Sequence, residues 1–157
     1  MTNHPPAPIP DGLSDLNIRP LDATSVEDLL FLWRAAELDH RPRGRDSADE
    51  LRREMDDDPG LFIGAFAGQR LVGSILATDD GRRGWINRLA VHPEFRRRGL
   101  AEKLIDAAEE RIRRRGIRII AALVMESNHP SRRVFEARGY TSMPDVLYYS
   151  KRDNPDV

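Results

Sequence analysis

The apolar residues of the chain recur with a helical period in two segments, of which one runs from Val26 to Trp33. The clearest segment runs from Gly99 to Arg115 and is followed by Gly116, a residue type that often ends helices. Within it, Leu100, Leu104 and Ile112 fall on one face, which predicts a helix packed on a core. Three shorter helices are predicted to begin at Thr24, Ser47 and Asn128.

Apolar runs bounded by turn residues predict the strands. Leu61–Ala67 and Leu71–Thr78 flank a Gly-Gln turn, which is the pattern of a hairpin. Ile117–Met125 is almost continuously apolar, so we expect a strand covered on both faces. Further strands are predicted at Leu16–Pro20, Trp85–Val91 and Leu147–Ser150. Strands and helices alternate along most of the chain, and this order predicts an α/β (α+β) fold with a mixed sheet.

The N-terminal segment contains four closely spaced prolines, Pro5, Pro6, Pro8 and Pro10. Proline fixes φ and removes a main-chain donor, so we expect residues 1–16 to form a disordered extension. No second linker and no internal repeat follows, and residues 17–157 are predicted to form one domain.

Composition narrows the classes of function. Of 157 residues, 39% are hydrophobic and 32% are charged, and the net charge is −1. This balance disfavours a basic nucleic-acid binder. The absence of cysteine excludes thiol nucleophiles and Cys-ligated zinc, and no His, Asp and Glu spacing predicts a metal site. No apolar run reaches the ~20 residues of a membrane span, and no secretory signal is recognisable, so we expect a cytoplasmic protein.

The candidate chemistry lies between the strand that ends at Val91 and the long helix. The connecting loop finishes in Arg96-Arg97-Arg98-Gly99-Leu100-Ala101, an R-x-x-G-x-A pattern. Main-chain N–H groups at a helix start have no intrahelical partner, and the helix dipole adds positive charge there. Gly99 has no Cβ, so an anion can approach the main chain closely. These features predict a bound phosphate or pyrophosphate at this helix start.

This segment resembles the acetyl-CoA-binding motif of the GCN5-related N-acetyltransferase (GNAT) superfamily. The strand end Leu89–Glu94 and the loop Arg96–Ala101 match its first part. Asn128 and the helix end Phe135–Tyr140 match the Asn and the Y-x-x-x-G-F/Y pattern that follow downstream. The resemblance covers roughly Ile18–Lys151 and is greatest to small single-domain prokaryotic members.

The resemblance implies a mostly antiparallel sheet of six to seven strands with about four helices. A central parallel pair, Trp85–Val91 and Ile117–Met125, would splay apart to hold the pantetheine arm of acetyl-CoA. The cofactor-binding residues that it implies are Leu89, Ala90, Val91, Arg96, Arg97, Arg98, Gly99, Leu100, Ala101 and Asn128. Asn128 has a second interpretation, since asparagine is also a favoured helix cap.

The expected reaction is direct attack of a primary amine, on a small molecule or a protein, on acetyl-CoA in a ternary complex. Many family members use a tyrosine as the acid for the leaving thiolate, but Phe135 occupies that position. Glu126 is the best placed candidate base, and an exposed loop carboxylate is the alternative interpretation. An acidic lip formed by Glu37 and Asp39 near His40, with Asp56, Asp57 and Asp58 further along, could attract a cationic amine. A solvated helix face is the alternative interpretation, and we prefer it for Asp56–Asp58.

Two other classes of function stay open. One is a GNAT-like module that binds CoA with weak or no catalysis, which Phe135 favours. The other is a nucleic-acid binder that uses Arg96–Arg98 and the arginines of the long helix, although acidic residues balance those arginines. We therefore expect acetyl-CoA and an amine as partners, with no nucleic acid and no membrane, and with a homodimer as one option.

Overall fold

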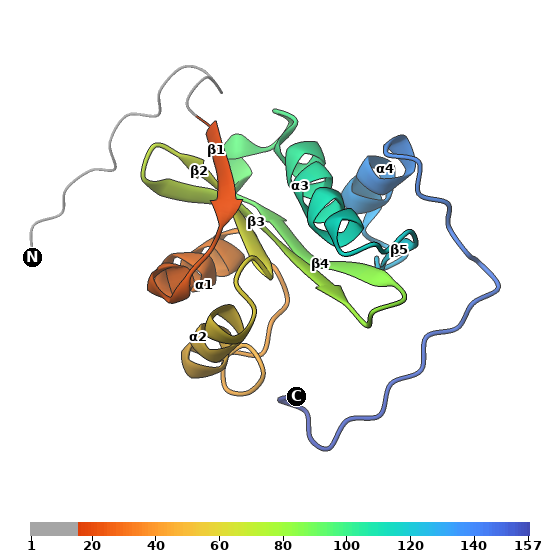
Figure 1. Cartoon of the computed structure of the whole chain (residues 1–157), viewed down its shortest axis with the longest axis horizontal. Coiled ribbons are helices and arrows are strands. Elements are labelled where there is room, and N and C mark those ends of the chain that lie inside the picture. The colour runs from red at the N-terminus through yellow and green to blue at the C-terminus, as the bar shows by residue number, and fades with distance from the viewer. Residues whose placement is uncertain (1–15) are drawn as a thin grey trace, which may run out of the picture.

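The computed structural model describes residues 16–157 and shows one sheet between two helical layers (Figure 1). Residues 1–15, which hold most of the predicted proline-rich extension, lie outside the described residues. The strands are β1 (Leu16–Pro20), β2 (Phe62–Ala67), β3 (Arg70–Asp79), β4 (Gly84–Val91) and β5 (Ile120–Ala122). The helices are α1 (Val26–Ala35), α2 (Ala48–Asp57), α3 (Leu100–Arg114) and α4 (His129–Ala137), with short 3-10 turns η2 (Ala23–Ser25) and η3 (Pro93–Phe95).

The sheet has the order β1-β2-β3-β4-β5, and its first four strands are antiparallel neighbours. The mixed, mostly antiparallel α/β sheet and the four helices are confirmed for the described residues. The prediction of six to seven strands is wrong, because the described chain forms five.

The central strands β2 and β3 are buried on both faces and divide the core in two. One cluster joins the sheet to α3 and α4 and includes Ile75, Leu104 and Phe135. The other joins the opposite face to α1 and α2 and includes Trp33 and Leu51. Because side chains alternate along a strand, a strand between two cores must be apolar at nearly every position. This requirement explains the two apolar runs of the hairpin.

Local capping agrees with the sequence in α2 and differs in α1. The Ser47 hydroxyl accepts a hydrogen bond from the Glu50 N–H at 3.4 Å, as a cap of this helix should. The predicted cap at Thr24 is wrong. Asp22 is the capping residue, because its carboxylate accepts from the Thr24 N–H at 2.9 Å and opens η2 one turn before α1.

The parallel pair β4 and β5 separates after a short contact. Gly84, Trp85 and Ile86 pair with Ile120–Ala122, and the ladder then ends. Beyond Ile86, β4 continues along β3 only. The splayed pair is therefore present, but it stands at the edge of the sheet and not at its centre.

Two predicted strands differ from the structure. The strand predicted at Ile117–Met125 is reduced to Ile120–Ala122, and Met125 is 75% exposed. It was expected to be covered on both faces, but all three residues of β5 are only partly buried. The strand predicted at Leu147–Ser150 is absent, because this segment follows α4 as an extended arm away from the sheet (Figure 1).

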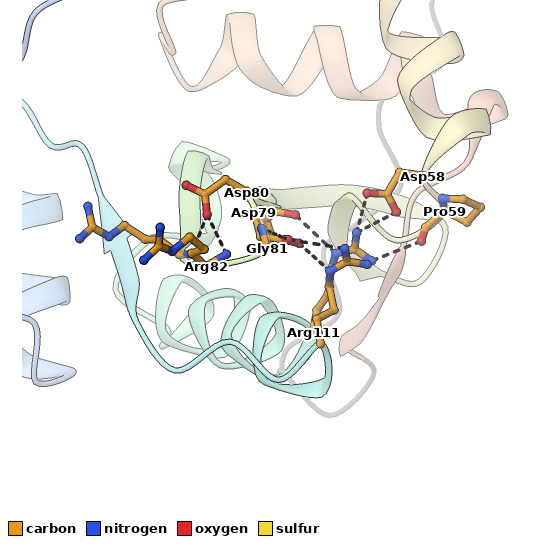
Figure 2. A network of polar contacts seen from close by, with 10 residues as sticks. Asp58, Pro59, Asp79, Asp80, Gly81, Arg82 and Arg111 are labelled. Carbon is orange, nitrogen blue, oxygen red and sulfur yellow. Dashed lines mark hydrogen bonds and ion pairs between the residues drawn. The ribbon is translucent and has the colours of Figure 1, made fainter.

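An arginine on α3 holds the α2–β2 connection against the sheet. The Arg111 guanidinium donates to both carboxylate oxygens of Asp58 at 2.8 Å and reaches the carbonyls of Pro59 and Ala77 at 3.4 Å (Figure 2). Its side chain is only 18% exposed. A guanidinium group that donates to four acceptors at low exposure stabilises the folded protein more than a surface ion pair does.

We predict that Arg111→Ala lowers the free energy of unfolding by about 1–3 kcal/mol, because four acceptors lose a charged donor. The matched control is Arg114→Ala on the same helix, whose side chain is 76% exposed and pairs with Glu110 one turn away. An exposed pair of this kind contributes less than about 1 kcal/mol. Urea unfolding of the three proteins measures the difference, and equal losses in both variants would contradict the assigned role of Arg111.

Candidate active site

A bulge in β4 marks the point where the two parallel strands separate. Four residues of β4, from Asn87 to Ala90, span the same stretch as three residues of β3, from Ser74 to Leu76. Arg88 lies in this bulge with φ at 54°, a left-handed conformation that is uncommon outside glycine. The extra residue changes which main-chain groups face each edge of the strand.

The direction of the main-chain groups follows from two hydrogen bonds. Before the bulge, the Gly84 N–H donates to Ile119 O beside β5 at 2.9 Å. After it, the His92 N–H donates to Val72 O of β3 at 2.8 Å. Main-chain groups alternate between the two edges of a strand, so Leu89 and Val91 direct theirs into the gap that β5 has left. Ala90 between them pairs with Ser74 and is buried.

The loop from β4 to α3 is anchored by an aromatic side chain. Phe95 in η3 is 4% exposed, and the guanidinium of Arg98 lies 5.4 Å from its ring centroid. Arg97 and Gly99 both have positive φ, at 62° and 75°. This loop therefore bends sharply twice before α3 begins at Leu100.

The N-terminus of α3 presents main-chain donors without a capping side chain. Gly99 is the cap residue, and the first main-chain bond there joins the Lys103 N–H to Gly99 O at 3.3 Å. The N–H groups of Leu100, Ala101 and Glu102 precede this bond and have no intrahelical acceptor. A Cβ on Gly99 would meet no atom within 4 Å, so the space beside Gly99 is open. The arrangement fits an anionic group.

The three loop arginines have different surroundings. Arg96 donates to Val91 O and to Ala36 O, both at 3.3 Å, and so links the end of β4 to the end of α1. Arg97 and Arg98 are exposed beside the helix start. Their charges add to the positive end of the helix dipole, which favours an anion at this position.

The opposite side of the gap is formed by the segment between β5 and α4. The side-chain oxygen of Asn128 accepts from the Ser131 N–H at 3.2 Å, so Asn128 caps α4. Glu126 is exposed, and its main-chain carbonyl accepts from Arg132 at 3.1 Å. Both residues thus stand at the end of α4 that follows β5.

The aromatic pair at the end of α4 is structural. Phe135 is 6% exposed and packs edge-on against Tyr140 with 5.1 Å between ring centroids. The Tyr140 hydroxyl donates to Glu109 on α3 at 2.8 Å. Burial and this hydrogen bond to a carboxylate raise the pKa of Tyr140 well above its usual value. Its role is to fasten α4 to α3.

A polar cluster beside the bulge was missed by the sequence argument. The Arg88 guanidinium donates to the buried carboxylate of Asp46 at 2.7 Å and also contacts the Asp39 carbonyl. Partial burial raises the pKa of the nearby Glu54 carboxyl, which lies on α2. These residues are more than thirty positions from Arg88 in sequence, so no local pattern could indicate that they meet.

The predicted acidic lip is divided by the structure. Asp39 pairs with Arg41 at 2.8 Å and lies in the α1–α2 connection, beside the bulge. Asp58 instead belongs to the Arg111 cluster, and Asp56 and Asp57 are exposed. The ring of His40 lies tilted against that of Trp33, with 5.6 Å between ring centroids.

Within residues 16–157 no group of three or more His, Asp or Glu side chains is placed to hold a metal ion. Over the same residues, no helix is long and apolar enough to cross a membrane.

Comparison with solved structures identifies the fold. The aminoglycoside N-acetyltransferase AAC(6')-Iy, solved in complex with a bisubstrate analogue of CoA, superimposes with a TM-score of 0.73. That alignment covers 88% of this chain and 99% of that chain at 23% identity. The PaiA N-acetyltransferase of Thermoplasma acidophilum, solved with coenzyme A, gives a TM-score of 0.70 at 22% identity, over 78% of this chain and 87% of that chain.

Sequence comparison gives the family. An acetyltransferase of Yersinia enterocolitica is 32% identical over 137 residues, covering 87% of this chain and 95% of the relative. An acetyltransferase of Sodalis glossinidius is 33% identical over the same shares. The model of the acetyltransferase (GNAT) family matches residues 26–140, which include the bulge, the arginine loop and α4. The chain belongs to the acetyltransferase (GNAT) family.

Proposed function

We propose that this protein is an acetyl-CoA-dependent N-acetyltransferase that acetylates a primary amine in a ternary complex. The observation that carries the proposal is the uncapped N-terminus of α3, which opens beside the gap between β4 and β5. Family membership supports acetyl transfer as the reaction. The acceptor is a small molecule or a protein amine.

The residues around the gap fit the parts of acetyl-CoA. The pyrophosphate would bind the N–H groups between Arg97 and Ala101, next to the exposed guanidinium groups of Arg97 and Arg98. The pantetheine amides would pair with the main chain of Leu89 and Val91, as an added strand does at an open sheet edge. Arg96 would hold the loop in place, because its two acceptors lie on β4 and α1.

Asn128 would use its remaining amide donor toward the pantetheine arm. Its carbonyl oxygen is already engaged with the Ser131 N–H, so only the NH₂ group is available for a ligand. The cap and the cofactor contact are therefore compatible in one side chain.

The acceptor amine would enter on the side of the α1–α2 connection. Arg88 and Arg96 fasten this connection to β4 at Asp39, Asp46 and Ala36, next to the bulge. The α1–α2 connection, which would face the thioester end of the cofactor, is therefore held by β4, the same strand that would bind the pantetheine. Such fixed geometry favours transfer through proximity and orientation of the two reactants.

The proton transfers of the reaction would involve Glu126 and solvent. When bound, acetyl-CoA supplies a thioester that an uncharged amine can attack. Glu126 would accept the proton of the attacking amine, either directly or through one water molecule. Phe135 has no proton to give, and the Tyr140 hydroxyl is engaged with Glu109, so the thiolate would leave without an acid from α4.

The arginines of α3 do not favour nucleic acid as a partner. Arg113 pairs with Glu109, and Arg114 pairs with Glu110, each across one helical turn. These pairs neutralise most of the positive face that a phosphate backbone would need.

The first prediction concerns the anion site. Gly99→Glu would place a carboxylate in the open space before α3 and should reduce CoA affinity by at least tenfold through repulsion and exclusion. Gly116→Glu is the matched control, because Gly116 also has positive φ, at 80°, and open space, but lies after the other end of α3. Both variants carry a similar backbone strain of ~1–2 kcal/mol. Calorimetric titration with CoA measures the two affinities. Equal affinities in the two variants would show that this loop does not bind CoA.

The second prediction concerns the proposed base. Glu126→Gln should lower kcat by about 10²–10⁴-fold, the range for a general base, and should leave CoA affinity unchanged. Glu136→Gln removes an exposed carboxylate from α4 and should keep full activity. If Glu126→Gln also keeps full activity, the proton passes to solvent or to Glu54, and Glu126 is only an exposed loop residue.

The third prediction tests the function itself. Incubation with acetyl-CoA and a panel of small amines and peptide N-termini should release free CoA thiol with at least one acceptor. Thiol release can be followed directly because the chain contains no cysteine. Tight CoA binding without turnover across the panel would instead support a non-catalytic CoA-binding module.

A further inference from the structure

His40 is a histidine beside the β4 bulge that the proposed proton transfers do not use. It lies in the α1–α2 connection and is partly buried. Its ring and the Arg88 guanidinium lie against the same indole, each 5.6 Å from the ring centroid of Trp33. The Trp33 indole N–H donates to the Ser74 hydroxyl at 3.1 Å, and Ser74 is one of the β3 residues between which the register shifts. His40 is therefore held at the bulge, in the segment where the acceptor amine would enter.

The main chain fixes which ring nitrogen of His40 carries a proton. The Nδ1 atom lies 2.8 Å from the carbonyl oxygen of Leu38. A carbonyl oxygen can only accept a hydrogen bond, so Nδ1 is the protonated nitrogen and donates to it. In an uncharged imidazole the other nitrogen then has a lone pair and no proton. Nε2 of His40 is therefore a proton acceptor.

The Nε2 atom of His40 is accessible from outside the protein. Among residues 16–157, no hydrogen-bond partner of Nε2 is present, because the side-chain hydrogen bond of His40 is the one to Leu38. In the same part of the chain, every buried side-chain nitrogen and oxygen has a partner. Nε2 must therefore reach the surface, since it would otherwise be a buried polar atom without a partner.

The charged groups around the His40 ring are engaged with one another. On the connection itself, Asp39 pairs with Arg41 at 2.8 Å. On the side of β4, Arg88 pairs with the buried carboxylate of Asp46 at 2.7 Å, and Glu54 of α2 lies near this pair. No ion pair joins the described charges to His40. Its ring is held by a hydrogen bond and by ring packing, and Nε2 is left for a substrate.

The reaction needs a proton acceptor before the attack as well as during it. An alkyl amine such as a lysine side chain has a pKa of about 10.4, so it is a charged ammonium at neutral pH. An ammonium nitrogen has no lone pair with which to attack a thioester. One proton must therefore leave the acceptor first, and a second leaves the nitrogen as the amide forms.

We propose that His40 is the base that makes the acceptor amine uncharged, an inference that rests on the proposed function. One N–H bond of the incoming ammonium breaks, its proton binds to Nε2, and the electron pair stays on the amine nitrogen for the attack. The Leu38 carbonyl keeps its hydrogen bond from Nδ1 and stabilises the imidazolium that forms. Because Nε2 reaches the surface, this proton then passes to solvent. The second proton, released as the amine attacks, is the one that goes to Glu126.

Two variants separate a base from a merely structural side chain. His40→Asn keeps an amide N–H that can donate to the Leu38 carbonyl but has no basic nitrogen, whereas His40→Ala removes both groups. With the acceptor that the amine panel identifies, both should lower kcat/KM at pH 7 by about 10²-fold or more and leave CoA affinity unchanged. The loss should shrink by up to about tenfold per pH unit as the pH rises, because more of the free amine is then uncharged. A loss confined to His40→Ala would indicate a structural role and would overturn the proposal.

Nuclear magnetic resonance of the ¹⁵N-labelled full chain tests the ring assignment without any turnover. The His40 signals, identified by their disappearance in His40→Asn, should show a protonated Nδ1 and an unprotonated Nε2 at alkaline pH. A protonated Nε2 would overturn the proposal. A wild-type protein that acetylates no amine would overturn the proposed function and this step with it. Wild-type turnover combined with an unchanged pH profile in His40→Asn would overturn the role of His40 alone.

Discussion

The site depends on one constraint, namely that main-chain polar groups must find partners. In most of the protein the sheet and helix ladders meet this requirement. At two neighbouring places they do not, because β5 leaves β4 after Ile86 and because no side chain caps α3 at Gly99. The donors and acceptors left there are fixed in direction by elements packed on the core. A ligand with amides at one end and phosphates at the other can satisfy both sets.

Arginine side chains hold the parts around that gap. Arg88 joins the β4 bulge to the α1–α2 connection, and Arg111 joins α3 to the loop before β2. Both act as planar forks with several acceptors, and both have low exposure. By contrast, Arg97 and Arg98 are exposed, and these are the two that we propose contact the ligand. The same residue type therefore serves structure or binding according to its surroundings.

Local sequence patterns predicted the elements well where local physics decides them. The helical period placed α3, and the Ser47 hydroxyl caps α2 as its sequence indicated. The glycine and arginine pattern before α3 predicted an anion site, and the structure brings its donors and positive charges together there. These features depend on neighbours within a few residues. The same patterns misjudged β5 and Leu147–Ser150, because whether an apolar strand is buried depends on distant neighbours.

The sequence alone therefore determined the helices, the hairpin, the glycine and arginine pattern of the loop before α3 and the family resemblance, since each is encoded in adjacent or periodically spaced residues. Tertiary structure alone decided that the splayed pair stands at the sheet edge, that Asp46 meets Arg88, and that the last apolar segment is left unpaired. These outcomes depend on which distant surfaces meet. Local sequence patterns cannot predict such contacts. Their free energy comes from packing and desolvation between segments that lie far apart in the sequence.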